Sequence, residues 1–199
     1  MATFSKTNAQ TLLALQSVAA STVLVGSAVD VSGKMGGLIY VRFARRAATA
    51  AGAGVNIRLE ASQSASANNS WFPFAVLTTA FAAVNATTLD AEAASGQAVI
   101  PLTATTGFTA GGIGFCDNGT IANSEWFRVA SVSAGVSVTA EENLVNTQAN
   151  GTAATAGAEI YSPINLPEGA LRIRAVADGS LFTQAFAIQV LYSTIDGIA

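Results

Sequence analysis

Side chains that commonly carry enzyme chemistry are scarce in this chain. Histidine is absent from all 199 residues, which excludes Ser-His-Asp and Cys-His nucleophile systems and most zinc sites. Cys116 is the only cysteine, so no disulfide can form within the chain. It follows Phe115 in a pattern typical of a strand, where a small buried thiol is commoner than a nucleophile. The sequence therefore predicts no cysteine nucleophile.

Carboxylates are the remaining candidates for catalysis. Hydrolysis by a carboxylate pair needs two acids that converge in a cleft. Glu141 and Glu142 are adjacent, and in a strand they would point to opposite faces. Asp117 and Glu125 flank a predicted hairpin, but an aspartate at a turn commonly caps its own backbone. We expect a protein that is not an enzyme, and the catalytic alternative is a glycan hydrolase built on Asp117 and Glu125.

Loops that bind metals or cofactors are also poorly represented. The segment 117–119 begins like a calcium-binding loop, but Ile121 and Ala122 stand where an EF-hand loop needs ligands. The segment 112–114 lacks the third glycine and the following helix of a dinucleotide site. We therefore expect no cofactor, no metal ion and no small-molecule substrate.

The composition favours a protein that is covered by other proteins. Charged residues make up 11% of the chain, against about 25% in an average protein. A surface so poor in charge is easily desolvated, which suits a subunit buried on several sides; a weakly charged soluble monomer is the alternative. The formal net charge of −3 gives no excess of basic side chains for phosphates, so we expect no nucleic-acid partner.

Three arginines, Arg42, Arg45 and Arg46, cluster in one short stretch. Arginine tolerates burial at interfaces because its guanidinium group is weakly hydrated and pairs with carboxylates through two hydrogen bonds. We predict that this stretch contacts a partner protein, with a solvated strand end as the equally weighted alternative.

Strand patterns dominate the first half of the chain. Residues 38–44 are apolar on both faces, and residues 55–60 alternate between apolar and polar side chains. We expect these two strands to form a long hairpin. Residues 71–77 form a third predicted strand, in which Pro73 indicates a sheet edge or a bulge.

Two further strands are predicted near the end of the chain. Residues 171–176 alternate, and after a turn at 178–180 the run 185–192 places Phe186 and Tyr192 on one face. We expect a closing hairpin. Because the last strand carries no charge, it is predicted to lie either inside a sheet or under a neighbouring subunit.

The first 20 residues are predicted to form an N-terminal arm. Leu12, Leu15 and Ala19 would share one face of a helix, but an extended arm docked on a neighbour fits equally well. We predict interface contacts for Leu12, Leu13 and Leu15. No apolar run approaches the ~18 residues of a membrane span, and polar residues interrupt the segment, so we read it as mature sequence without membrane contact.

Short strands and frequent glycine turns fill residues 96–159, as in a small barrel. The predicted fold is all-β: a jelly-roll-like β-sandwich formed by residues 21–95 and 160–199, with an inserted small β-barrel formed by residues 96–159.

A succession of local patterns within this insertion carries a family resemblance. These patterns are Val99-Ile100, Gly107-Phe108, Gly111-Gly112, Asp117-Asn118-Gly119 and Ser124-Glu125-Trp126, with a closing valine-rich strand over 129–138. The segment resembles a small β-barrel module that recurs in virion proteins of tailed bacteriophages. Gly114 departs from the pattern, because a β-branched residue is usual there, and it suggests a bulge.

The flanking regions are similar to phage capsid-decoration (cement) proteins at residues 29–32, at the strand entering Arg45-Arg46, at 71–73 and at 171–179. This resemblance implies a subunit made in the host cytoplasm that sits on the virion capsid surface. It also implies a homotrimer that bridges neighbouring major capsid protein subunits and stabilises the shell. A tail, baseplate or fibre component is the alternative, and a bacterial adhesin would need an export signal.

Overall fold

The computed structural model describes residues 4–6, 9–19, 21–46, 52–68, 70–81, 86–179 and 185–198. Strands dominate these residues, and their single helical element is the 3₁₀ turn η1 (Ile121–Asn123). No helix within this described part has the length and hydropathy of a membrane span. The all-β prediction is confirmed.

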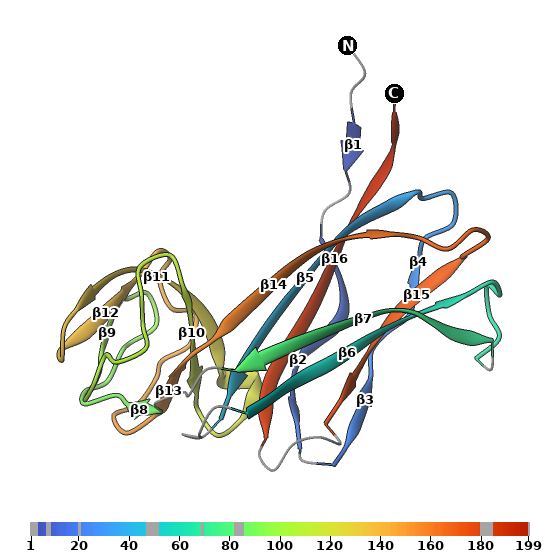
Figure 1. The fold of residues 1–199 in the computed structure, drawn as a ribbon. Helices are drawn as coiled ribbons and strands as arrows, with labels where there is room; N and C mark the ends of the chain where they lie inside the picture. The colour runs from blue at the N-terminus through green and yellow to red at the C-terminus, as the bar shows by residue number, and fades with distance from the viewer. Residues whose placement is uncertain are drawn as a thin grey trace.

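Two five-stranded sheets pack face to face as a sandwich (Figure 1). The first sheet has the order β1-β16-β5-β14, with β2 also paired to β16, and consists of β1 (Phe4–Lys6), β16 (Phe186–Ile198), β5 (Gly36–Arg45), β14 (Ala158–Asn165) and β2 (Gln10–Val18). The second has the order β3-β15-β6-β7, with β4 also paired to β15, and consists of β3 (Val23–Val25), β15 (Arg172–Asp178), β6 (Gly52–Ser62), β7 (Trp71–Phe81) and β4 (Val29–Asp30).

The sandwich core follows from alternation along the strands. On β6, Ile57 and Leu59 are fully buried, whereas Arg58 between them faces outward. On β16, the predicted apolar face from Phe186 to Tyr192 is buried in the same core. The Tyr192 hydroxyl donates a hydrogen bond to the Gly36 carbonyl, so its polar atom is satisfied there.

The inserted module is a curled six-stranded sheet that lies beside the sandwich (Figure 1). Its order is β8-β13-β10-β11-β12-β9, formed by β8 (Thr87–Thr88), β13 (Ala153–Ala156), β10 (Ile113–Asp117), β11 (Glu125–Ser133), β12 (Ser137–Ala140) and β9 (Val99–Pro101). A bridge between Leu89 and Leu102 brings the two ends of the sheet together. The module has its own core, so a sandwich with a barrel-like insertion is confirmed.

The barrel begins earlier than the predicted residue 96. Strand β8 pairs with β13, and both Leu89 and Ala93 are buried in the barrel core. Residues 87–95 therefore belong to the insertion and not to the sandwich, and β14 returns the chain to the sandwich at Ala158.

Both predicted hairpins of the sandwich are wrong. Strand β5 pairs with β14 and β16 in the first sheet, whereas β6 pairs with β7 and β15 in the second. Strands β15 and β16 likewise belong to different sheets. In each case the two consecutive strands lie in opposite layers of the sandwich.

The segment predicted to be an N-terminal arm contains strand β2 of the first sheet. Strand β2 pairs antiparallel with β16, and Leu12 and Leu13 are buried in the chain's own core. A register shift around this pair lets two consecutive leucines point inward, which a regular strand does not allow. Leu12 and Leu13 are therefore core residues of the sandwich and are not exposed to a neighbouring subunit.

Two predictions about the position of a strand within its sheet are confirmed, one for the strand that contains Pro73 and one for the last strand. β7 is the outermost strand of its sheet, and its pairing with β6 shifts register beside Pro73, as at a bulge. The uncharged stretch 186–192 of β16 lies between β2 and β5, so its lack of charge reflects an internal position.

Gly114 does not mark a bulge. It pairs in regular register with Phe127 on one side and Ala156 on the other. A Cβ atom at this position would lie 2.2 Å from Cζ of Phe127, so the ring occupies the space of the missing side chain.

Candidate functional site

The seam between sandwich and barrel is the most elaborate polar and aromatic site of the described chain. Its centre is apolar: Ala44 and Ala187 lie opposite each other on β5 and β16, and Phe115 packs with them. The Phe115 ring is 4.7 Å from the Trp126 ring, and Leu15 of β2 packs against this cluster. Two alanines on the sandwich leave room for these aromatic rings to approach its sheet.

One flank of the seam is an ion pair between Arg46 and Asp117. Nε of Arg46 lies 2.6 Å from Oδ2 of Asp117, and Nη2 lies 2.7 Å from Oδ1. Nη1 also donates to the Ser17 hydroxyl. Burial alone would raise the pKa of Asp117, but hydrogen bonds from Arg46, Gly119 and Ser124 outweigh it and hold this pKa below its ordinary value.

The opposite flank is centred on Glu159 of β14. Arg128 of β11 and the hydroxyl of Tyr40 both donate hydrogen bonds to Oε1 of Glu159. The Tyr40 and Tyr161 rings stack with centroids 4.5 Å apart. Burial and the hydrogen bond to Glu159 raise the pKa of Tyr40, and the hydrogen bond to Glu159 raises the pKa of Arg128.

Two of the three arginines in the predicted cluster, Arg42 and Arg46, lie at the seam with the chain's own barrel, and the third is buried in the sandwich. Arg46 binds Asp117, and Arg42 donates from Nε to the Tyr40 hydroxyl within the Glu159 flank. Arg45 is buried, with its guanidinium carbon 5.8 Å from the centroid of the Phe186 ring. The Arg45 carbonyl accepts a hydrogen bond from the Thr155 hydroxyl of the barrel. Arg46 thus joins the two bodies directly, whereas Arg42 holds the Tyr40 hydroxyl, to which the barrel's Arg128 also donates.

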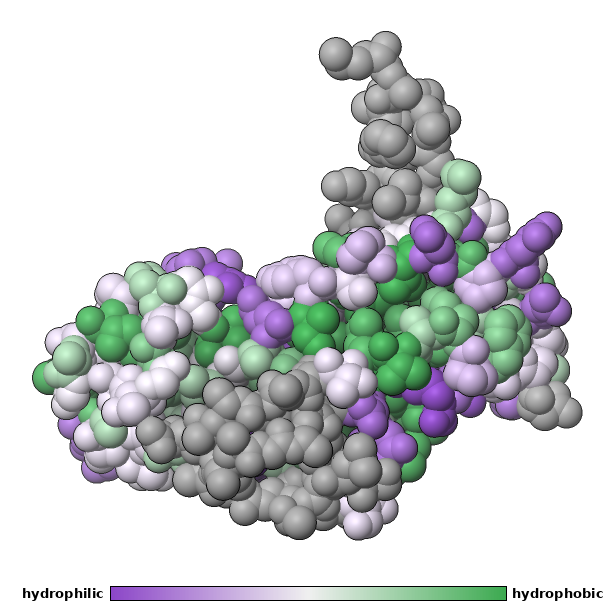
Figure 2. Space-filling view, in the orientation of Figure 1, coloured by the Kyte–Doolittle hydropathy of each residue, from purple (hydrophilic) through white to green (hydrophobic). Residues whose placement is uncertain are grey.

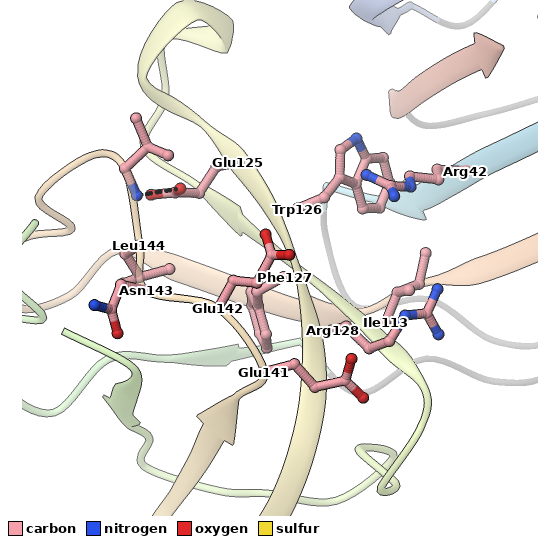
Figure 3. A pocket seen from close by; sticks show the side chains of 11 residues that line it. Arg42, Ile113, Glu125, Trp126, Phe127, Arg128, Glu141, Glu142, Asn143 and Leu144 are labelled. Atoms are coloured by element: carbon pink, nitrogen blue, oxygen red, sulfur yellow. Dashed lines mark hydrogen bonds between the residues drawn. The ribbon is translucent and has the colours of Figure 1, made fainter. Parts of the chain in front are cut away.

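A cavity of about 190 Å³ opens at this seam (Figure 3). In this view Glu125, Glu141 and Glu142 lie on one side of it, and Arg42 and Arg128 lie on the other. Glu125 has a structural role. Its carboxylate accepts hydrogen bonds from the backbone N–H groups of Val145 and Asn146 and from the Gln148 side chain. It thereby fixes the loop that borders the cavity.

The carboxylates considered for hydrolysis belong to separate networks. Asp117 binds Arg46 and the backbone N–H of Gly119, whereas Glu125 holds the loop after β12. Glu141 and Glu142 are exposed. Burial, followed by the charge of Glu125, raises the pKa of the Cys116 thiol to about 12. Among the described residues, no group of three or more acidic or cysteine side chains is arranged to hold a metal ion.

The side of the sandwich between β7 and β14 is a second surface of interest. Both strands are the last of their sheets, and no described strand pairs with their outer sides. Figure 2 shows hydrophobic surface gathered in the middle of the sandwich, where Figure 1 places these two strands. Partly buried side chains of this region are Phe72, Phe74, Leu77, Ile160 and Leu166.

Sequence reasoning found only part of the seam. It singled out Arg42, Arg45, Arg46 and Leu15, but it assigned no role to Glu159 or Tyr40. A signal was present, because isolated charges in strongly apolar strands commonly have a charged partner. The identity of that partner depends on which strands become neighbours.

Comparison with known proteins adds no relative. No protein-family model matches the chain, and no curated protein sequence matches it.

Proposed function

We propose that this chain is a structural subunit of a tailed-bacteriophage virion that decorates and stabilises the capsid by bridging neighbouring capsid subunits. The family resemblance of the insertion and its flanks supports this proposal. The observation that carries it is the seam, because an ion pair on one side and the Glu159 cluster on the other fix the barrel against the sandwich.

A barrel held rigidly against the sandwich is suited to bridging two neighbouring capsid subunits. Contacts made by one body hold the other in place, so the second contact costs less entropy than it would for a flexible pair. Each body carries exposed hydrophobic side chains, which on the sandwich are Val23, Val25, Met35, Leu38, Val76 and Tyr161, and on the barrel are Val99, Val136 and Val145. Both bodies therefore offer apolar area for contact with a neighbour.

Stabilisation follows from mass action. A subunit that binds two neighbours in a closed shell, and not in separated capsid proteins, lowers the free energy of the closed shell. The mechanism needs no catalytic group. The partners are the major capsid protein and further copies of this chain, which the family resemblance implies form a trimer.

The test is co-sedimentation of the purified chain with shells that lack it. We expect binding that saturates at a fixed ratio and raises the temperature at which the shells open. The variant Arg46→Ala with Glu159→Ala loosens the seam and should bind without raising that temperature as much. A chain that does not bind the shells would overturn the proposal. Binding of that chain to purified tails would then favour the tail, baseplate or fibre alternative.

A further inference from the structure

Strands β1 and β16 extend the first sheet as a ribbon that projects beyond the sandwich (Figure 1). Strand β16 pairs with β2 as far as Tyr192 and with β5 as far as Ile195. Beyond Ile195 its only described neighbour is β1. We call β1 and residues 195–198 of β16 the terminal ribbon. Two strands alone are marginally stable in water and need a further packing surface, so we expect the terminal ribbon to lie against one.

The barrel lies at the opposite end of the same sheet. Ala187 of β16 packs with Phe115 of the barrel, whereas Ile195 begins the terminal ribbon. The eight residues between these two ends span about 26 Å of extended strand. The terminal ribbon thus continues away from its own barrel (Figure 1), and a barrel that covers it must belong to a second molecule.

The outer face of the first sheet meets the barrel at the cavity of about 190 Å³. On β5 residues 39, 41 and 43 are buried, so alternation turns Leu38, Tyr40 and Arg42 outward. Leu38 and Tyr161 of the neighbouring β14 are 41% and 55% exposed. Trp126 of the barrel lines the cavity with Arg42. We call the surface formed by these five residues together with Glu141 and Glu142 the corner.

Charges of both signs surround the corner. The charged residues at and around the cavity are Arg42, Glu125, Arg128, Glu141, Glu142 and Glu159. Arg128 and Glu159 form an ion pair, and Glu125 is held by two backbone N–H groups. Within the described part of the chain, neither Arg42 nor the two adjacent glutamates form an ion pair. One cation and two carboxylates, on opposite sides of the cavity (Figure 3), therefore remain for a partner.

We propose that the terminal ribbon of one copy docks in the corner of a second copy. The ribbon contains one cation, Lys6, and one anion, Asp196. The corner offers a charge of the opposite sign to each, two carboxylates for the lysine and Arg42 for the aspartate. The ribbon also contains the apolar residues Phe4 and Ile198, and the corner presents tyrosine, tryptophan and arginine, which commonly dominate the binding energy of protein interfaces.

The dimensions of the two surfaces agree. The distance from Leu38 to Arg42 along β5 is about 13 Å, and residues 195–198 extend about 10 Å. The contact is head-to-tail, because the two surfaces differ, and repeated contacts of this kind close into a ring when the rotation permits. This inference rests on the self-association within the proposed function and is independent of capsid binding.

The first test is sedimentation velocity of the full chain over a range of concentrations, without shells. We expect reversible oligomers. The variants Lys6→Glu and Glu142→Lys should each raise the dissociation constant by about tenfold or more, because like charges then face each other. A chain that is monomeric throughout, or whose oligomers resist both substitutions, would overturn the inference. Shell binding by such a chain would leave the proposed function standing.

Mixing the two variants tests the head-to-tail geometry. An equal mixture of Lys6→Glu and Glu142→Lys should regain the oligomers that each variant loses alone. The reason is that the altered ribbon then meets the altered corner, and the intact ribbon meets the intact corner. A mixture that stays as dissociated as its components contradicts docking between the ribbon and the corner.

Matched controls place the same change of charge elsewhere. Ser133→Asp with Ala134→Asp lowers the net charge by two units, as Lys6→Glu does, and Ser133→Lys with Ala134→Lys raises it by two, as Glu142→Lys does. Both positions are exposed at the turn between β11 and β12, and both controls should keep the oligomers. Dissociation of the controls would show that net charge alone governs assembly. If Glu142→Lys abolishes shell binding but leaves the oligomers intact, the corner receives the capsid protein and the inference is wrong.

Discussion

Arg46 and Asp117, which are 71 residues apart in the chain, meet through two parallel hydrogen bonds across the seam. Their side chains keep only 23% and 11% of their exposure, so the pair is largely shielded from water. Parallel hydrogen bonds of this kind fix orientation as well as distance. The barrel is thereby held at a defined angle to the sandwich.

Substitution of Asp117 by asparagine should loosen the seam. The change leaves Arg46 partly buried without its counter-charge, and we expect the free energy of unfolding to fall by about 1–3 kcal/mol. Trp126 lies in the seam, so its fluorescence should report the change during denaturant titration. Asp90→Asn, at an exposed position, is the matched control and should alter stability little; equal losses in the two variants would contradict a stabilising role for the pair.

The free energy of unfolding should decrease at acidic pH. Burial acts to raise the pKa values of Asp117 and Glu60, but hydrogen bonds and charges from their arginine partners prevail and lower both. A carboxyl group whose pKa is lowered by folding stabilises the protein above its unfolded-state pKa of about 4, and this stabilisation is lost as the pH falls through the folded-state pKa.

We therefore expect the free energy of unfolding to be nearly constant from about pH 7 to 5 and to drop below about pH 4. Asp117→Asn and Glu60→Gln should each show a shallower drop than the unmodified chain in denaturant titrations across this range. A drop as steep as that of the unmodified chain in both variants would show that other groups dominate the acid response.

Cys116 should be unreactive in the folded protein. Its side chain is fully buried in the barrel core, and burial raises the pKa of the thiol to about 12, so almost no thiolate is present at about pH 8. A chromogenic disulfide reagent should label it only after denaturant is added. Rapid stoichiometric labelling of the native chain would show that the barrel opens readily or that the thiol is accessible.

Gly114 should not tolerate a side chain. A methyl group there would collide with the Phe127 ring, and we expect Gly114→Ala to cost about 1–3 kcal/mol through overpacking. A double-mutant cycle measured by denaturant unfolding checks the cause. Because Phe127→Leu removes the ring, the cost of Gly114→Ala should be smaller in that background; an unchanged cost would point to a backbone effect.

The sequence alone determined several of the strands and which of their faces are buried, although it did not identify β2 as a strand. Alternation along residues 55–60 and 186–192 predicted inward-facing side chains, and the structure confirms this for Ile57 and Leu59 and for the face from Phe186 to Tyr192. Pro73 marked a sheet edge, because proline lacks the N–H that a central strand needs. These features depend on neighbouring residues, so local patterns were sufficient.

Only the tertiary structure decided which strands are neighbours. Alternation sets the face of a side chain but not the strand beside it, so β5 and β6 were wrongly paired although both strands were identified. For the same reason, the sequence did not identify Asp117 as the ion-pair partner of Arg46. Asp117 reaches it only because the barrel folds back on the sandwich, where the aromatic rings of Phe115 and Trp126 pack against small residues such as Ala44 and Ala187.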